Sequence, residues 1–191
     1  MKRLESYDEA IEAVVFTELE IAATVDRMAT ELARLCAGEA ILLVGVLKGA
    51  LFFTADLARA LTRIEDGPSE IRMDFLAVSS YGNSNRTSGE VRLLKDVAES
   101  IEGRNVVIVE DIVDNGLTLA YLQGLLGGRH PASLRTCVLL DKPFHRTVDV
   151  PIDVLGLEAP DAFIVGYGLD YQERFRNLPY LAKLQASIFA E

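Results

Sequence analysis

The sequence contains no tryptophan and only two cysteines, Cys36 and Cys137. These cysteines lie far apart in the chain. They form neither a Cys-x-x-Cys pair nor a metal-ligand spacing with His130 or His145, the two histidines, to which the sequence assigns no role. We therefore expect two reduced, buried thiols, and this pattern argues against a disulfide-stabilised fold and against a cysteine-ligated metal site.

Long apolar runs are absent as well. No run reaches the roughly 18 residues that a membrane-spanning helix requires. The opening stretch MKRLESYDEAIEA also lacks the apolar segment of a signal peptide. We expect no membrane partner and a cytoplasmic protein.

Basic residues are scarce relative to acidic ones. Nineteen Lys and Arg residues face twenty-nine Asp and Glu residues, which gives a formal net charge of −10. This excess repels phosphate backbones and argues against a nucleic-acid partner. It does not exclude a small anionic ligand, because a pocket can be locally positive or can use a metal ion. The length of 191 residues predicts a single domain with a sizeable core.

Apolar runs of strand length alternate with segments of helical periodicity. A capping box at Thr17 and Glu20 begins the first helix, because each residue can bind the other's backbone N–H. The pattern predicts helices over 17–35, 50–61 and 116–126, and strands over 40–46, 71–80, 90–95, 105–111, 133–140, 152–157 and 162–167. This alternation is typical of an α/β fold with a largely parallel central sheet flanked by helices.

Polar residues that could bind a ligand or take part in catalysis follow several of these strands at their carboxyl ends. Open α/β sheets bind ligands at this edge. The most unusual group follows the strand 105–111. Gly116, Leu117 and Thr118 open a helix directly after it, and the free N–H groups of a helix opening suit a phosphate. The stretch is neither a Walker loop nor a GxGxxG motif.

Three carboxylates precede this helix opening. The adjacent Glu110 and Asp111 can bind ribose hydroxyls or Mg²⁺. Asp114 is placed either to act as a base or simply to favour the positive end of the helix, and both readings stay open for this residue. The second reading does not explain Glu110 and Asp111, because two adjacent carboxylates at a buried strand end need a cation, a hydroxyl ligand or solvent.

The segment from Glu110 to Thr118 resembles the phosphoribosyl-pyrophosphate (PRPP) motif of type I phosphoribosyltransferases, in particular the bacterial-type hypoxanthine-guanine branch. The resemblance extends over residues 14–184 and includes Leu47-Lys48-Gly49, Leu140-Asp141-Lys142-Pro143, and the segment from Asp161 to Leu178. It implies a type I fold with a small hood built from chain-terminal segments, mainly 144–191 and part of the N-terminus. It also implies a mobile lid over 80–95 and a cis peptide in the loop 47–49.

The resemblance further implies transfer of 5-phosphoribosyl from PRPP to N9 of hypoxanthine or guanine, with Mg²⁺ as cofactor. Asp114 would be the general base, and Lys142 would select a 6-oxopurine. The implied ribose and 5′-phosphate site comprises Glu110, Asp111, Asp114, Asn115, Gly116, Leu117 and Thr118. Pyrophosphate would be bound by Lys48, Gly49, Ser80, Tyr81 and Arg176, the purine by Lys142, Phe163, Ile164 and Asp170, and the metal by Glu110, Asp111 and Asp170.

Two positions depart from the family pattern: Asn115 replaces a common Thr or Ser, and Leu117 stands where some members carry Lys. The family also implies a homodimer or homotetramer. Other functions stay open beside this one: a PRPP-sensing regulator that binds RNA, a nucleotide-dependent oxidoreductase, and, within the enzyme class, a xanthine-preferring member. The negative charge argues against the first and the missing GxGxxG against the second.

Overall fold

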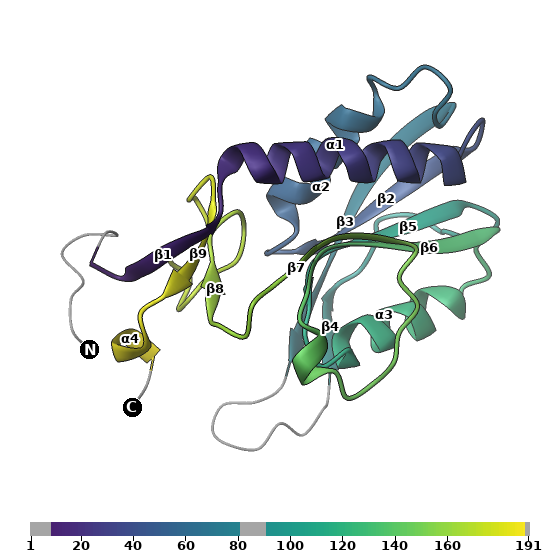
Figure 1. The fold of residues 1–191 in the computed structure, drawn as a ribbon. Helices are drawn as coiled ribbons and strands as arrows, with labels where there is room; N and C mark the ends of the chain where they lie inside the picture. Colours follow the sequence, from purple (N-terminus) through teal and green to yellow (C-terminus); the bar gives the residue numbers. More distant parts are fainter. Residues whose placement is uncertain (1–8, 81–90, 190–191) are drawn as a thin grey trace.

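The computed structural model of the protein describes residues 9–80 and 91–189. A six-stranded sheet lies between helices, and a smaller three-stranded sheet projects from one end (Figure 1). The large sheet has the order β4-β3-β2-β5-β6-β7, in which β4 is antiparallel to β3 and all other neighbours are parallel. Its strands are β2 (Ala40–Leu47), β3 (Glu70–Ser80), β4 (Val91–Lys95), β5 (Asn105–Val113), β6 (Ser133–Asp141) and β7 (Val154–Glu158). The expected α/β fold with a largely parallel sheet is confirmed.

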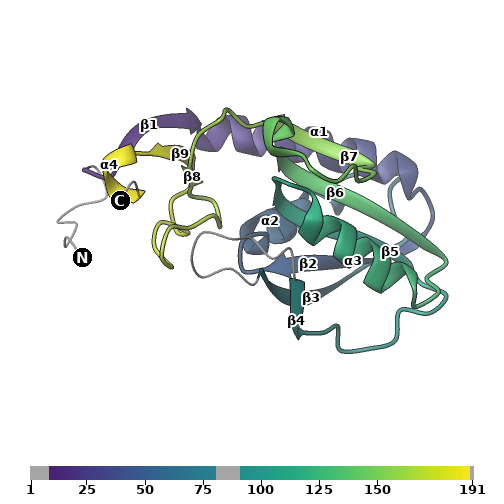
Figure 2. The same cartoon turned by 90° about the horizontal axis from the view of Figure 1, so that it is seen from below.

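Helices cover both faces of the large sheet. α1 (Glu18–Leu35) and α2 (Leu51–Leu61) lie on one face, and α3 (Leu117–Gly127) lies on the other (Figures 1 and 2). The predicted capping box is present at the start of α1, where the Thr17 N–H donates to the Glu20 carboxylate at 2.8 Å and the Glu20 N–H donates to the Thr17 hydroxyl at 3.3 Å. A short 3₁₀ helix, η1 (Pro143–His145), follows β6.

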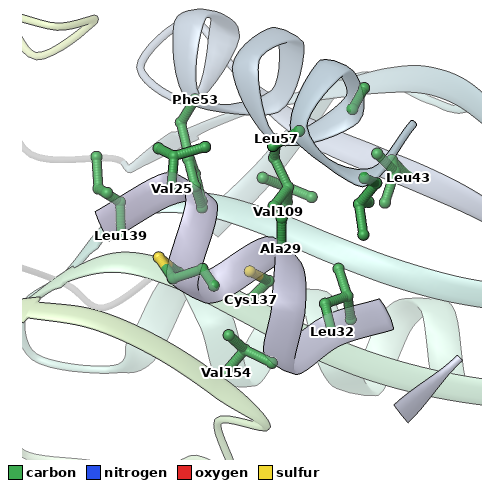
Figure 3. Close-up of a cluster of buried hydrophobic side chains, with 14 of the residues drawn as sticks. Val25, Ala29, Leu32, Leu43, Phe53, Leu57, Val109, Cys137, Leu139 and Val154 are labelled. Atoms are coloured by element: carbon green, nitrogen blue, oxygen red, sulfur yellow. The ribbon is translucent and has the colours of Figure 1, made fainter. Parts of the chain in front are cut away.

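Each face of the sheet buries its own apolar cluster. Side chains of α1 and α2 interdigitate with those of the central strands (Figure 3), and the cluster includes Val25, Ala29, Leu32, Leu43, Phe53, Leu57, Val109, Cys137, Leu139 and Val154. On the other face, Leu119, Leu122 and Leu126 of α3 pack on the sheet. Burial of this apolar surface is the main force that holds the helices on the sheet. Both cysteines are free and buried, as expected, and burial raises the pKa of the Cys137 thiol.

The smaller sheet has the antiparallel order β1-β9-β8 and joins segments from both ends of the chain. Its strands are β1 (Ile11–Phe16), β8 (Ile164–Val165) and β9 (Leu181–Leu184), and α4 (Ala186–Phe189) follows. A separate apolar cluster that includes Val165, Phe175 and Leu178 forms the core of this smaller sheet. This sheet is the hood that the family resemblance implies.

Two strands of this smaller sheet, β1 and β9, were not predicted. The strand predicted over 162–167 is reduced to the two residues of β8, because Gly166 turns the chain with a φ of +100°. β7 lies within the range expected for the hood, yet it pairs with β6 in the large sheet. Across the described ranges, no helix is long and apolar enough to cross a membrane.

Two leucines of α1, one buried and one exposed, test the packing of the core. Leu32 is fully buried, whereas the Leu19 side chain is 82% exposed. We expect Leu32→Ala to lower the free energy of unfolding by about 2–5 kcal/mol, because it removes apolar contacts and leaves a cavity. Leu19→Ala should change it by less than about 0.5 kcal/mol. Urea titrations followed by circular dichroism measure both values, and equal losses in the two variants would contradict this packing.

Candidate active site

The carboxyl end of β5 carries the central acidic residues of the site. Pairing of β5 with β2 ends at Val109, whereas pairing with β6 continues to Val113. The last four residues of β5 therefore have no partner in β2, and Asp111 among them meets the loop that follows β2. The prediction that this strand ends at Asp111 was wrong by two residues, because Ile112 and Val113 continue the ladder with β6.

Glu110 and Asp111 consequently lie inside the strand and are buried, with 7% and 8% of their surface exposed. Burial raises the pKa of Glu110 well above its usual range, and the nearby Asp111 charge adds to this shift. Burial also raises the pKa of Asp111, although hydrogen bonds, including one from the Ile112 N–H at 2.9 Å, oppose the rise. Among the described residues, Oε2 of Glu110 is buried without a hydrogen-bond partner. An unpaired buried carboxylate oxygen is costly and favours a site that receives a cation or a hydroxyl donor.

The loop after β2 closes against these carboxylates. The peptide between Leu47 and Lys48 is cis, as the resemblance implies. Gly49 is so close to Asp111 that a Cβ atom at this position would lie 1.6 Å from Asp111 Oδ2. On its other side, the Gly49 carbonyl oxygen would lie 1.9 Å from a Cβ at Gly168 in the hood. Only glycine at position 49 lets the backbone pass between the acidic strand end and the hood.

The hood places one arginine beside this loop. Arg176 donates to the Gly168 carbonyl at 2.7 Å and forms ion pairs with Asp170 at 2.7 Å and Glu173 at 3.1 Å. Its Nε is buried without a hydrogen-bond partner among the residues described. The positive charge of Arg176 is also one of the influences that lower the pKa of Asp111. The structure thus brings Arg176 and Asp170 to the edge where Gly49 and Asp111 meet.

The turn between β5 and α3 has the shape expected of a phosphate cradle. Gly116 precedes α3 with a φ of +89°, and a Cβ there would lie 2.4 Å from the Val148 carbonyl oxygen, so the turn requires glycine. The Asn115 side chain accepts the Leu117 N–H at 3.0 Å. Its amide nitrogen is therefore the part of this side chain left to donate to a ligand, and the first helical N–H is already used.

The residues expected to bind the purine lie at the end of β6 and in the segment that leads into β8. Lys142 is half-buried, and its Nζ donates to the Ala162 carbonyl at 2.7 Å. This contact places the ammonium group beside Phe163. The Phe163 ring is 37% exposed, stacks with Phe189 at a centroid distance of 5.1 Å, and meets Tyr171 edge-on at 5.5 Å. The Ile164 side chain is buried, so only its backbone is suited to contact a ligand.

Residues 15–172 match the phosphoribosyl transferase domain family. The chain belongs to this family. It is 47% identical to the hypoxanthine-guanine phosphoribosyltransferase of Bacillus subtilis over 94% of this chain and 96% of that protein. It is 44% identical to the enzyme of the same name from Mycobacterium avium over 98% of this chain and 92% of that protein.

Solved structures agree with the sequence comparison. A hypoxanthine phosphoribosyltransferase from Staphylococcus aureus has a TM-score of 0.89 at 35% identity, and the match covers 99% of this chain and 100% of that one. A hypoxanthine phosphoribosyl transferase from Trypanosoma cruzi has a TM-score of 0.86 at 41% identity, with 100% and 97% covered. The type I phosphoribosyltransferase fold that was expected from the sequence is therefore confirmed.

Several residues expected in this phosphoribosyltransferase site lie outside the described residues or are not in contact with the acidic pair. Ser80 ends β3, whereas Tyr81 and most of the lid expected over 80–95 lie outside the described residues. In the described part of the chain, no three His, Cys, Asp or Glu side chains form a metal-binding cluster. Glu110 and Asp111 thus form one acidic pair, while Asp170 is held separately by Arg176.

One residue that the sequence left without a role belongs to the site. His145 lies in η1, and its Nδ1 is 3.0 Å from Oδ1 of Asp114. Neither its neighbours in the sequence nor its spacing from Asp114 predicts this contact, because the two residues come from different loops. The only available signal was a titratable side chain three positions after Lys142.

The raised pKa values of the acidic pair predict how stability depends on pH. In the folded state Glu110 and Asp111 hold their protons more tightly than in the unfolded chain. The stability that they contribute is therefore present at acid pH and lost as the pH rises through the raised values. Glu110→Gln cannot ionise, so we expect its melting temperature at pH 8 to exceed that of the native chain by about 3 °C, which corresponds to roughly 1 kcal/mol.

At pH 4 the two melting temperatures should approach each other, because the native carboxyl group is then protonated. Differential scanning calorimetry in metal-free buffer measures both. A difference that stays constant from pH 4 to pH 8 would contradict the assignment of Glu110 as a buried group with a raised pKa.

Proposed function

We propose that this phosphoribosyltransferase acts in purine salvage, by transferring the 5-phosphoribosyl group of PRPP to N9 of hypoxanthine or guanine. The products are IMP or GMP and pyrophosphate. The observation that carries the proposal is the meeting of three features at one sheet edge: the buried pair Glu110 and Asp111, the Gly49 loop, and the helix opening at Gly116. Relatives that are 44–47% identical carry the name hypoxanthine-guanine phosphoribosyltransferase.

The 5′-phosphate is assigned to the turn from Asp114 to Thr118. A helix opening supplies backbone N–H groups and the positive end of the helix dipole to a phosphate. Gly116 brings the backbone close, and the Thr118 hydroxyl and the Asn115 amide add donors. Because Asn115 already occupies the Leu117 N–H, the phosphate should rely on the later N–H groups of the first helical turn. Leu117 adds no charge, so the neutral donors carry this contact.

The ribose and the leaving group are assigned to the acidic pair and the adjacent loop. Glu110 and Asp111 can accept hydrogen bonds from the 2′- and 3′-hydroxyls, which would satisfy the unpartnered Oε2 of Glu110. Pyrophosphate is assigned to the backbone at Lys48 and Gly49, together with Arg176 and, by resemblance, Ser80 and Tyr81. Electrostatic stabilisation of a departing anion is commonly the largest contribution to such a reaction.

The same residues fit a divalent cation. Carboxylate oxygens are the ligands that Mg²⁺ prefers, and a buried carboxylate pair with an unpartnered oxygen suits a nearby cation. Glu110 and Asp111 would hold Mg²⁺ near the ribose, and Asp170 would hold a second ion near pyrophosphate if it loosens its ion pair with Arg176. The ion would neutralise charge that develops on pyrophosphate as it departs.

The purine is assigned to the segment from Ala162 to Ile164 and to Lys142. The Lys142 ammonium has three N–H donors, and one of them holds the Ala162 carbonyl. The remaining donors favour a 6-oxo group and disfavour a 6-amino group, whose protons would face the cation. Phe163 offers a ring face for stacking, and the Ile164 backbone offers hydrogen bonds to the base edge. Asp114 would then accept the N7 proton as N9 attacks.

A base panel tests this proposal. Hypoxanthine, guanine, xanthine, adenine and uracil are each mixed with PRPP and Mg²⁺, and nucleotide products are separated by chromatography. We expect turnover of hypoxanthine or guanine that is lost on chelation of Mg²⁺ and absent with adenine.

Each other outcome points elsewhere. A preference for xanthine would transfer the assignment to the rival within the enzyme class. Saturable PRPP binding without turnover of any base would overturn the enzymatic proposal and favour the PRPP-sensing regulator.

The glycine of the pyrophosphate loop supplies a sharper test. Gly49→Ala places a methyl group against the Asp111 carboxylate, so the loop must move. We expect kcat/KM for PRPP to fall about 100-fold, because a displacement of about 1 Å at a reacting centre has this effect. Gly124→Ala in α3 is the matched control, since a Cβ there meets no atom within 4 Å, and its activity should equal that of the native chain. Equal activities of the two variants would contradict the role given to this loop.

The assembly and the location of the protein follow from the resemblance as proposals. We propose a homodimer or homotetramer in the cytoplasm. Exposed apolar side chains at the start of α2, Leu51 at 43% and Phe52 at 41%, support a subunit contact on that surface.

A further inference from the structure

His145 joins the proposed general base to a second carboxylate. Its Nδ1 lies 3.0 Å from Oδ1 of Asp114, and its Nε2 lies 3.0 Å from Oδ1 of Asp161. Asp114 follows β5, whereas Asp161 precedes β8, so the imidazole ring connects the phosphate turn with the segment assigned to the purine. All three side chains are partly exposed, at 51% for Asp114, 47% for His145 and 68% for Asp161, so protons exchange readily with solvent.

Each of the two contacts requires an N–H donor from the ring. An ionised carboxylate only accepts hydrogen bonds, and a neutral imidazole carries a proton on just one of its two nitrogens. Both contacts are therefore satisfied together only by the imidazolium form. When the ring is neutral, one nitrogen presents a lone pair to a carboxylate, and that contact is lost.

The neighbouring charged groups already have partners of their own. Arg146 Nε donates to the Asp114 carbonyl oxygen at 3.1 Å, and its guanidinium forms an ion pair with Asp141. Lys142 donates to the Ala162 carbonyl. The charged groups on the described elements around the ring are thus Asp114, Asp141, Lys142, Arg146 and Asp161. Of these, the carboxylates of Asp114 and Asp161 are the two that contact the imidazole.

We propose that His145 is a positioning residue for Asp114, which it holds toward the segment assigned to the purine. The inference rests on the proposed transferase reaction. In that reaction the bond between C1′ and N9 forms, the bond between C1′ and the pyrophosphate oxygen breaks, and the N7 proton passes to Asp114. The Nδ1 contact fixes the Asp114 carboxylate in place for this transfer, so loss of that contact should slow turnover.

Two amide substitutions separate the contacts of the ring. His145→Asn keeps an N–H donor near the position of Nδ1, toward Asp114, but it cannot ionise. His145→Gln keeps a donor near the position of Nε2, toward Asp161, and loses the one toward Asp114. We expect His145→Asn, which keeps the donor toward Asp114, to retain a higher kcat than His145→Gln. His145→Gln should be slower than native by about two- to five-fold, the effect of an exposed ion pair.

Asp161→Asn provides a variant outside the groups assigned to substrate binding. It replaces the carboxylate at Nε2 with an amide and leaves the Nδ1 contact with Asp114, so kcat should stay near native. The chain contains only two histidines, His130 and His145, so NMR of the imidazole C–H groups can follow them individually. Asp161→Asn should shift one imidazole signal, the one that His145→Asn abolishes, and leave the other unchanged.

The possible results are distinct. Equal turnover in His145→Asn and His145→Gln would overturn the inference alone. An unaltered His145 signal in Asp161→Asn would overturn it as well, independently of activity. Absence of turnover in the native chain would instead overturn the proposed function, and the inference would fall with it. Circular dichroism confirms that each variant is folded.

Discussion

The burial of two adjacent carboxyl groups at the end of β5 is the constraint on which the rest of the site depends. Glu110 and Asp111 are almost fully enclosed, and their pKa values rise because burial disfavours the charged form. A chain selected for stability alone would not place them there. Their neighbours follow from this choice. The loop after β2 passes so closely that only glycine fits at position 49, and Arg176 brings a compensating positive charge from the hood.

Ile112 and Val113, the two residues by which β5 exceeds its predicted length, determine where the turn to α3 begins. Because Ile112 and Val113 continue the ladder with β6, the turn to α3 begins beyond the sheet edge rather than within it. Gly116 then reverses the chain against Val148, and the Asn115 carbonyl accepts the N–H groups of Thr147 and Val148 at 3.0 Å each. The phosphate turn is therefore held from behind by the segment after β6, which also carries His145. The groups assigned to phosphate, ribose and base are in this way fixed to one another through backbone contacts.

The sequence predicted those parts of the structure that have strong local signals. Continuous apolar runs located the parallel strands, and the reciprocal capping of Thr17 and Glu20 located the start of α1. The segment from Glu110 to Thr118 indicated the family. The hood strands β1 and β9 had no such signal. β1 is largely exposed and pairs with β9, which is about 170 residues away in the chain, so its formation depends on a partner that no local pattern reveals. The same reason applies to His145, whose contacts with Asp114 and Asp161 arise only in the folded chain.

The proposed substrate of this chain, whose net charge is −10, is polyanionic, and two cations of different exposure lie at the proposed pyrophosphate site. The Lys48 ammonium pairs with Glu173 at 2.7 Å, but both side chains are about two-thirds exposed, at 65% and 64%. Such a pair contributes about 0–1 kcal/mol, so Lys48 can exchange it for a phosphate oxygen at little cost. Arg176 is only 24% exposed and is fixed by Asp170, Glu173 and Gly168. One cation is thus free to follow the ligand, while the other keeps the hood loop in place beside Asp111. Glu173 contacts both cations. If Lys48 moves to a ligand, the Glu173 carboxylate keeps only its contact with Arg176, and that ion pair should become stronger.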